Sequence, residues 1–455
     1  RLNILMLEKK YLLSIDNQNF KQKAFAWTQA NAFPIVAYLD NNQHFKTTEN
    51  ADNWEAILAV GAKNQVVQKW GETNFAFQKL KEFEINRNKK SWIFGFLSYD
   101  LKNEIEPNLV SENEDELDFP NLHFFEPQIL IKIYQNYVKI TADTGGGAFL
   151  VYQTILQQPI DDLTNGFDPN APISLKRKFK KSEYLDVIAQ LRAHIAAGDF
   201  YEINFCQAFF SNDFTEKQLS ESSAFSLFWR LNAIAKTPFA AFYRFNEHFL
   251  LCASPERFLQ KKGRKLISQP IKGTSRRGKT EAEDAFLKNE LQNDEKNRAE
   301  NVMIVDLVRN DLARVCTTGS IEVTELFGIQ AFESVFQMVS TIEGKLRPRK
   351  NWIDAIEATF PMGSMTGAPK VAAMQSIEHY ERTRRGLYSG SVGYVSPTGD
   401  FDFNVVIRSI LYNSIKKNMS FQVGGAIVYD SVAEAEFEEC EIKMRTILQA
   451  LGIKK

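Results

Sequence analysis

Short apolar runs separated by polar turns dominate the first third of the chain. Residues 33–39, 91–97 and 129–134 each predict a strand, because β-branched and aromatic residues fill them. A stretch rich in Pro, Asp and Asn follows at residues 158–172 and predicts a linker. We therefore expect an N-terminal region at 1–157 and a second region at 181–455, joined at about 158–180 and sharing one fold.

Helices are better marked after Lys181, where apolar residues recur at helical spacing. Ser182 is expected to cap a helix that ends at Gly198. Further helices are expected at about 281–293, along the apolar stripe from Val302 to Val315, and from about Val432 to Leu451, with strands at 249–252 and 403–408. The pattern predicts a mixed α/β (α+β) protein with much sheet.

Length, composition and net charge indicate a globular protein that binds neither nucleic acid nor membranes. At 455 residues the chain is long enough for two or three average domains or one large one. A hydrophobic content of 44% and a charged content of 24% are typical of a soluble globular protein. The formal net charge of -1 provides no general attraction for nucleic acid or for an anionic membrane, so neither partner is expected.

Cysteine usage and the apolar runs indicate a cytoplasmic protein. The four cysteines are scattered without a C-x-x-C pair, which argues against a disulfide framework and a zinc site. Glu8, Lys9 and Lys10 interrupt the early apolar stretch, so no signal peptide is expected. No run approaches the roughly 18 apolar residues of a membrane span. The cysteines are Cys206, Cys252, Cys316 and Cys440.

Lys272 lies in an apolar, strand-like run directly before Gly273. A lysine held in a confined, desolvated place can act as a free-amine nucleophile. Spacing alone favours an ordinary lysine at a strand end, and the motifs that follow shift this balance.

Two carboxylates share one face of the last predicted helix. Glu436, Glu439 and Lys443 are spaced i, i+3 and i+7. Such a pair suits magnesium, which takes few protein carboxylates and keeps positions for water and substrate oxygens. Taken alone, a solvated acidic face explains the same pattern. Glu300 begins the helix with the Val302–Val315 stripe, and Glu256 ends a strand-like segment, where burial would raise its pKa enough for a general acid.

Several groups are suited to binding an anion. The loop at 361–370 precedes a helix, whose free N–H groups attract anions, although it lacks P-loop spacing. Gly424 and Gly425 either let the backbone approach a ligand closely or bend a strand. Arg408, expected on a strand, is suited to bidentate contact with a carboxylate.

Taken together, these motifs resemble the chorismate-utilising enzymes, and within them the aminodeoxychorismate synthase component I (para-aminobenzoate synthase component I) branch. The N-terminal region resembles the anthranilate synthase component I type more loosely, chiefly at residues 95–100. The resemblance implies one large fold in which two β-sheets pack face to face with helices outside. The matching stretches follow in order between Lys181 and Leu451, the catalytic region: 254–258, 270–274, 298–307, 309–311, 363–370, 388–390 and 430–431.

The resemblance also implies a division of labour. Lys272 would attack C2 of chorismate while Glu256, as general acid, protonates the departing C4 hydroxyl. Ammonia would then add at C4 and expel the lysine, giving 4-amino-4-deoxychorismate for para-aminobenzoate and folate biosynthesis. Magnesium would be held by Glu300, Glu436 and Glu439. The implied chorismate contacts are Gly273, Thr274, Thr366, Tyr388, Arg408, Gly424, Gly425 and Lys443.

No cysteine lies in a nucleophile-elbow context, so the ammonia is expected from a separate glutaminase subunit. Since a lysine of pKa about 10.4 is almost wholly protonated near neutrality, magnesium and apolar flanks are expected to push Lys272 toward the neutral amine. For Glu256 a raised pKa is expected.

Two alternatives stay open. Anthranilate synthases component I resemble the chain but typically carry alanine in place of Lys272; that activity predicts anthranilate and pyruvate. A non-catalytic chorismate-binding homologue is disfavoured because Lys272, Glu256 and all three carboxylates are present. Glu202 stands where the family's isochorismate and salicylate synthases carry a water-activating lysine, which argues against those branches. The departures Asn297 and Ala208 have no assigned effect, and residues 12–15 lack the family's tryptophan-inhibition motif.

Overall fold

The computed structural model describes residues 7–44, 54–72, 75–143, 145–212, 214–215, 218–332 and 335–453. Its described strands form one hydrogen-bonded network in which each pairing is antiparallel. The strands are β1 (Leu7–Leu12), β2 (Ile35–Asp40), β3 (Ala56–Gln68), β4 (Ile93–Leu97), β5 (Leu122–Ile133), β6 (Tyr137–Ala142), β7 (Lys176–Arg177), β8 (Glu202–Ser211), β9 (Phe239–Phe245), β10 (His248–Ser254), β11 (Arg257–Lys262), β12 (Lys265–Gln269), β13 (Ile271–Arg276), β14 (Glu322–Ala331), β15 (Val335–Lys345), β16 (Gly367–Ala368), β17 (Ser391–Val395), β18 (Phe401–Val405), β19 (Ser409–Asn413) and β20 (Asn418–Ile427).

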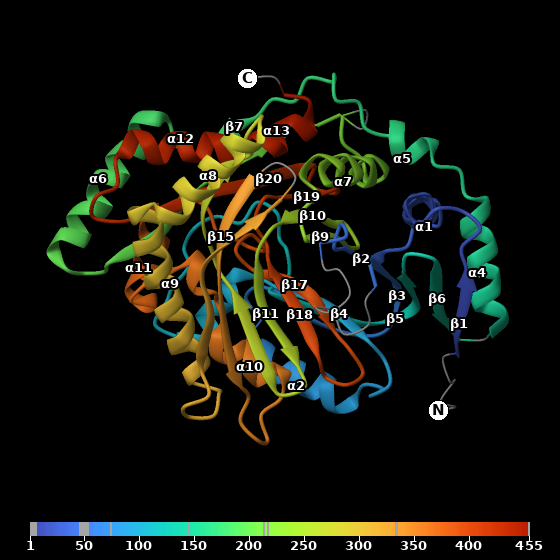
Figure 1. Ribbon diagram of the computed structural model, residues 1–455. Coiled ribbons are helices and arrows are strands. Elements are labelled where there is room, and N and C mark those ends of the chain that lie inside the picture. Colours follow the sequence, from blue (N-terminus) through green and yellow to red (C-terminus); the bar gives the residue numbers. More distant parts are fainter. Residues whose placement is uncertain are drawn as a thin grey trace.

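The helices surround this network (Figure 1). They are α1 (Asn17–Ala30), α2 (Ala76–Asn86), α3 (Lys102–Ile105), α4 (Gly145–Gln157), α5 (Asp161–Asn165), α6 (Lys181–Ala197), α7 (Glu221–Ala235), α8 (Glu281–Asn293), α9 (Glu295–Ala313), α10 (Trp352–Thr359), α11 (Lys370–Tyr380), α12 (Ala433–Lys443) and α13 (Arg445–Leu451), with short 3-10 turns η1 (Tyr99–Leu101) and η2 (Gly363–Met365).

The network has two halves that meet at β5. One half runs β6–β5–β3–β2–β9–β10–β19–β20–β8, and the other runs β5–β4–β17–β18–β11–β12–β15. The inner faces of the two halves pack together, since the ring of Phe96 on β4 lies edge-on to Tyr243 on β9 at 5.2 Å. The expected α/β fold with two packed sheet faces and outer helices is therefore confirmed, and the two faces belong to one continuous sheet that shares β5.

Alternating side chains on the first half build two separate cores. On β2, Val36 and Tyr38 face a cluster that is covered by helices α1, α4, α6, α7, α12 and α13. Ile35 and Ala37 face the other cluster, which lies between the sheet halves and extends to α2, α9 and α10. This period of two is what a strand with both faces buried requires.

Both predicted regions contribute to the same sheet. Strand β2 pairs with β9, and β4 pairs with β17, across the 158–180 segment. The boundaries 1–157 and 181–455 themselves stay a prediction.

Local departures from the predicted elements have simple causes. Helix α6 begins at Lys181 with Lys180 as its N-cap residue, so Ser182 lies inside the helix and is not its cap. The predicted last helix is divided at Met444 into α12 and α13. Arg408 was expected on a strand, but it follows β18 with a positive φ of 51°, in the connection to β19.

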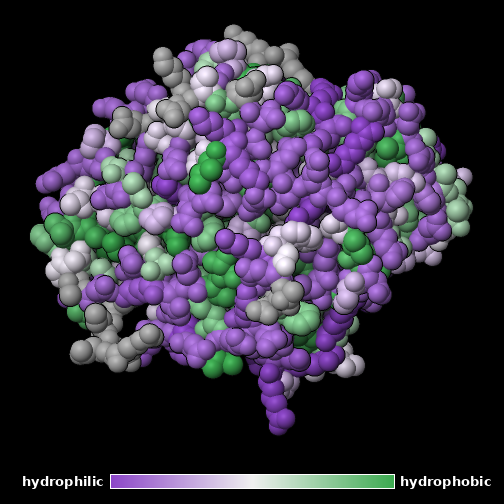
Figure 2. Space-filling view, turned by 180° about the vertical axis from the view of Figure 1, so that it is seen from behind, coloured by the Kyte–Doolittle hydropathy of each residue, from purple (hydrophilic) through white to green (hydrophobic). Residues whose placement is uncertain are grey.

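Most of the surface in Figure 2 is hydrophilic, with hydrophobic side chains scattered in small groups. Among the described helices none combines the length and apolar character needed to cross a membrane.

Candidate active site

Lys272 and Glu202 form a buried ion pair. Lys272 Nζ on β13 donates a hydrogen bond of 2.7 Å to Glu202 Oε1, at the start of β8. The exposed fractions are 8% for Lys272 and 1% for Glu202. The prediction of a confined, strand-borne lysine is confirmed.

The effect of magnesium on the protonation of Lys272 stays a prediction, and the protein groups alone favour the ammonium form. Burial favours the neutral amine, but Glu202, Glu300 and Glu256 together outweigh it and raise the pKa of Lys272. Three carboxylates around one ammonium stabilise its charge more than the apolar flanks destabilise it.

Glu256 lies between β10 and β11 and is 5% exposed. Burial raises its pKa to about 7, although a hydrogen bond from Ser364 and the charge of Lys272 oppose the shift. The Ser364 hydroxyl donates to Glu256 Oε1 over 2.6 Å. The expected raised pKa is confirmed, so Glu256 can hold a proton near neutral pH.

The turn η2 carries Ser364 and Thr366 and is tied to β8. Asn204 donates from its backbone N–H to Thr366 O at 2.8 Å and from its side chain to Ser364 O at 3.1 Å. The buried Arg385 guanidinium donates to Met365 O at 2.6 Å and to Asn204 O at 2.8 Å. These bonds hold Ser364, the hydrogen-bond partner of Glu256, in a fixed position relative to β8, the strand that carries Glu202.

The three predicted metal ligands lie on two helices that meet beside β20. Lys296 Nζ lies 3.3 Å from Glu436 Oε1 and 3.8 Å from Glu300 Oε1, and thereby links α9 to α12. Glu439 Oε1 pairs with Lys443 Nζ at 2.6 Å. Each carboxylate therefore faces a lysine ammonium.

The pKa values of these carboxylates shift in opposite directions. Burial raises the pKa of Glu300 to about 6, against the charges of Lys272 and Lys296. Burial acts in the same direction on Glu439, but Lys443 outweighs it and lowers the pKa of Glu439.

The donor set fits a hard cation held by few protein ligands. Glu436 is 2% exposed, and its Oε2 has no hydrogen-bond partner among the described residues. A Cβ placed on Gly425 would lie 3.3 Å from both Glu436 Oε2 and Glu439 Oε1, so the two carboxylates flank one backbone position. In the described ranges, no group of three or more His, Cys, Asp or Glu is arranged to ligate one ion. Two carboxylates with substrate oxygens are a usual magnesium arrangement.

Some of the predicted substrate contacts lie beside the predicted metal ligands, and others lie further along the strands. Lys443 Nζ donates to Gly424 O at 2.7 Å, which places both beside Glu439. Gly273 has a φ of 86°, and a Cβ there would lie 2.9 Å from Asn297 on α9, so the close approach of strand and helix requires glycine. Thr274 is exposed on β13 and pairs with Gln337.

The remaining contacts line the interior. Thr366 is fully buried and donates to Gly363 O and Met362 O. Tyr388 is 4% exposed, with its hydroxyl 3.4 Å from Cys206 Sγ. The Arg408 carbonyl accepts from Ala253 N–H at 3.3 Å, but its side chain has no hydrogen bond or ion pair within the described part of the chain. Burial lowers the pKa of Arg408, and the charge of Glu256 opposes this. An unpaired guanidinium of this kind is suited to a carboxylate ligand.

Sequence reasoning missed four residues that this geometry brings into the site: Glu202, Lys296, Ser364 and Arg385. Glu202 and Ser364 were noted from the family resemblance, but their contacts with Lys272 and Glu256 had no signal because these partners lie far away in the sequence. Lys296 was detectable, since it precedes Glu300 by one helical turn.

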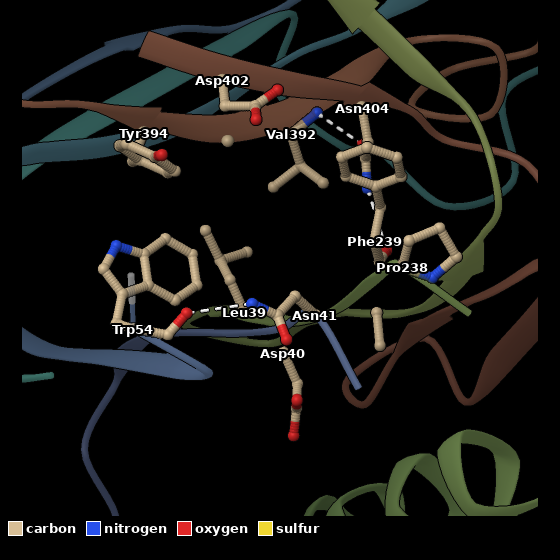
Figure 3. Close-up of a pocket in the computed structure, with 12 residues that line it drawn as sticks. Leu39, Asp40, Asn41, Trp54, Pro238, Phe239, Val392, Tyr394, Asp402 and Asn404 are labelled. Atoms are coloured by element: carbon tan, nitrogen blue, oxygen red, sulfur yellow. Dashed lines mark hydrogen bonds between the residues drawn. The ribbon is translucent and has the colours of Figure 1, made fainter. Parts of the chain in front are cut away.

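A separate small cavity of about 40 Å³ lies between the sheet halves (Figure 3). Trp54 and Tyr394, whose rings are 5.5 Å apart, line one end, and Phe239 and Asn404 line the other. None of the predicted site residues lines this cavity.

Comparison with known proteins agrees with this geometry. The family model for chorismate binding enzymes matches residues 22–449. Aminodeoxychorismate synthase component 1 of Bacillus subtilis is 33% identical over 417 residues, which cover 88% of this chain and 87% of that protein. An anthranilate synthase component I-like protein of Synechocystis sp. is 35% identical over 79% of this chain and 72% of that protein.

Among solved structures, anthranilate synthase component I from Streptococcus pneumoniae superposes with a TM-score of 0.75 at 26% identity, covering 89% of this chain and 94% of that one. Relatives named for two activities thus occur at similar identity. Because the family model spans most of the chain, this protein belongs to the chorismate binding enzymes.

Proposed function

We propose that the protein is an aminodeoxychorismate synthase component I, a transferase of nitrogenous groups that converts chorismate and ammonia to 4-amino-4-deoxychorismate. The observation that supports the proposal is a buried lysine, Lys272, near a buried carboxyl group, Glu256. Burial raises the pKa of Glu256 to about 7. A nucleophilic amine and a protonated acid are the two groups that this substitution needs.

The residues divide the chemistry as follows. Glu256 gives its proton to the C4 hydroxyl, which is a poor leaving group as hydroxide and departs as water. Lys272 attacks C2 at the same stage, and ammonia then adds at C4 and releases the lysine. Ser364, held by the β8 contacts, orients Glu256 for the proton transfer.

Substrate binding would rest on opposite charges. Arg408, without a partner of its own in the described chain, is suited to one carboxylate of chorismate. Glu436 and Glu439 would hold magnesium, with Glu300 on the neighbouring helix as the third predicted ligand, and the bound ion would supply positive charge for the ring carboxylate. Lys443 and the backbone of Gly424 and Gly425 would border the same end of the substrate.

The source of ammonia would be a separate glutaminase subunit. Hydrolysis of glutamine by a cysteine enzyme needs an accessible thiolate. All four cysteines of this chain are buried, and burial raises the pKa of each, to about 12 for Cys206 and about 11 for Cys252 and Cys316. This supports a glutaminase reaction that is carried by residues outside this sequence.

Anthranilate synthase component I is the second candidate, because relatives of that name are equally similar in sequence. It would need no nucleophile at position 272. The buried Lys272 favours the first candidate, since that reaction uses an amine nucleophile at this position.

The test is a product analysis. Purified protein is incubated with chorismate, ammonium and magnesium at mildly alkaline pH, and the products are identified by mass spectrometry. We expect aminodeoxychorismate without pyruvate, and none from the Lys272→Ala variant. Anthranilate with pyruvate, formed equally by Lys272→Ala, would establish the second candidate instead.

A further inference from the structure

Glu202 was not among the predicted site residues, yet it makes the shortest polar contact of Lys272. Its Oε1 accepts the 2.7 Å hydrogen bond from Lys272 Nζ, and both side chains are shielded from solvent. The other oxygen, Oε2, is buried and has no hydrogen-bond partner in the described chain. A buried carboxylate with an unused oxygen has a large energetic cost, which a functional role would explain.

The backbone around Glu202 is fixed. Glu202 pairs with Ala368 in the short β8–β16 ladder, and Tyr201 N–H donates to Ala368 O at 2.7 Å. A Cβ on the neighbouring Gly367 would come within 2.1 Å of Glu202 O, so the turn after Thr366 packs directly on this backbone. Glu202 therefore stays beside Lys272 instead of moving to solvent.

The carboxylates around the pair hold Lys272 as an ammonium, so attack on the substrate needs a group that can take its proton. Lys272 faces Glu202 from β8, Glu300 from α9 and Glu256 from the β10–β11 connection. Lys296 and Glu439 lie beyond Glu300. Of these described groups, Glu202 is the one that accepts a hydrogen bond from the lysine, which is the geometry that a proton acceptor needs.

We propose that Glu202 is the general base of the reaction, taking a proton from Lys272 before attack and returning it when the lysine leaves. This inference rests on the function proposed above. It deepens that function, because the lysine is otherwise held as an ammonium, which is no nucleophile.

The proton count closes over one cycle. The Lys272 ammonium gives one proton to Glu202, and its neutral amine forms the bond to C2. The C4–O bond breaks, and Glu256 gives its proton to the departing hydroxyl, which leaves as water. Ammonia then bonds to C4, the C2–N bond breaks, and Lys272 leaves as a neutral amine that regains its proton from Glu202. The new C4 ammonium returns a proton to Glu256.

The decisive variant is Glu202→Gln. The amide keeps the size of the side chain and an oxygen that accepts the Lys272 hydrogen bond, but it takes up no proton. Glu202→Asp retains a carboxylate at a longer reach, and Glu357→Gln removes a surface carboxylate that pairs with Lys81. Thermal melts of each variant verify that it is folded.

Two rates are measured over a range of pH. Without ammonia, the covalent adduct of chorismate on Lys272 is followed by rapid quenching and intact-protein mass spectrometry. With a constant concentration of free ammonia, product formation is followed at steady state. We expect Glu202→Gln to slow both near neutral pH by about 10²- to 10⁴-fold, with recovery as hydroxide replaces the base at higher pH. Glu202→Asp should recover part of the rate, and Glu357→Gln should match the wild type.

The two proposals fail in different ways. If the wild type forms neither adduct nor amino product, the proposed function is wrong and the role of Glu202 falls with it. If the wild type is active and Glu202→Gln is within about threefold of it near neutral pH, the general-base role alone is wrong. A Glu202→Gln variant that is slow at every pH, without recovery, also overturns the role.

Discussion

The hydroxyl of Ser364 donates a 2.6 Å hydrogen bond to Glu256, a carboxyl group that burial has brought to a pKa of about 7. The bond favours the ionised form, and burial favours the protonated form. Their balance leaves Glu256 about half protonated at neutral pH, so it can both give and regain a proton during one turnover.

A pH profile tests this balance. Because the proposed general acid must carry its proton, kcat/KM should fall as the pH rises through about 7. In Ser364→Ala the bond to the ionised form is lost, so the pKa of Glu256 rises and the alkaline limb moves to higher pH. Ser414→Ala, which removes a hydroxyl that donates to Glu221 away from the site, should leave the profile unchanged. A limb that moves to lower pH in Ser364→Ala would contradict the assignment.

We expect turnover to depend on magnesium, and magnesium binding to depend on the buried carboxylate of Glu436. We expect a chelator to abolish turnover and added magnesium to restore it. Glu436→Gln should weaken magnesium binding more than tenfold in calorimetric titration, since it replaces the buried ligand with the unpartnered oxygen. Glu438→Gln, on the exposed side of α12, serves as the matched control and should bind as the wild type does. Equal binding by both variants would exclude Glu436 as a ligand.

A buried ion pair behind the site should dominate stability. Lys370 Nζ donates to Asp311 Oδ2 at 2.6 Å and to Pro361 O at 2.8 Å, and burial raises the pKa of Asp311 and lowers that of Lys370. Asp311→Asn leaves the ammonium buried without its counter-charge, which should cost about 3–5 kcal/mol of unfolding free energy in denaturant titration.

Asp306→Asn is the control on the same helix, because its partner Arg309 is exposed and such pairs contribute little. A loss for Asp311→Asn no larger than that of the control would show that Lys370 finds other partners.

Residues close in sequence were predictable, and those brought together by the sheet were not. The spacing of Glu436, Glu439 and Lys443 placed them on one face of α12, because helical period alone decides this. The raised pKa of Glu256 was predictable from its place at the end of a strand-like segment, where burial was expected. The upward contribution of Glu202 to the pKa of Lys272 was not predictable, because Glu202 lies 70 residues away and approaches the lysine only in the folded chain.

The backbone conformation of Arg408 was also not predictable from the sequence, because it depends on which strands pair. Its apolar neighbours predict a strand, yet the chain must turn there to enter β19, and Arg408 adopts a positive φ. Sequence patterns report which residues are buried, whereas turns of this kind depend on which strands pair.

Two adjacent glycines on β20 should respond differently to alanine. A Cβ on Gly424 would lie 2.2 Å from the Phe205 carbonyl oxygen and 2.5 Å from Cys206 Sγ, across the β20–β8 ladder. A backbone atom at that distance cannot be moved cheaply, so Gly424→Ala should lower the melting temperature and distort the ladder.

A Cβ on Gly425 meets only the carboxylate oxygens of Glu436 and Glu439, each at 3.3 Å. Those oxygens end flexible side chains, so Gly425→Ala should fold normally but displace the ligands and weaken magnesium binding several-fold. Circular dichroism melts and magnesium titrations on both variants separate the two effects. If Gly425→Ala binds magnesium like the wild type, the cation does not lie between Glu436 and Glu439, and the predicted metal site must be placed elsewhere.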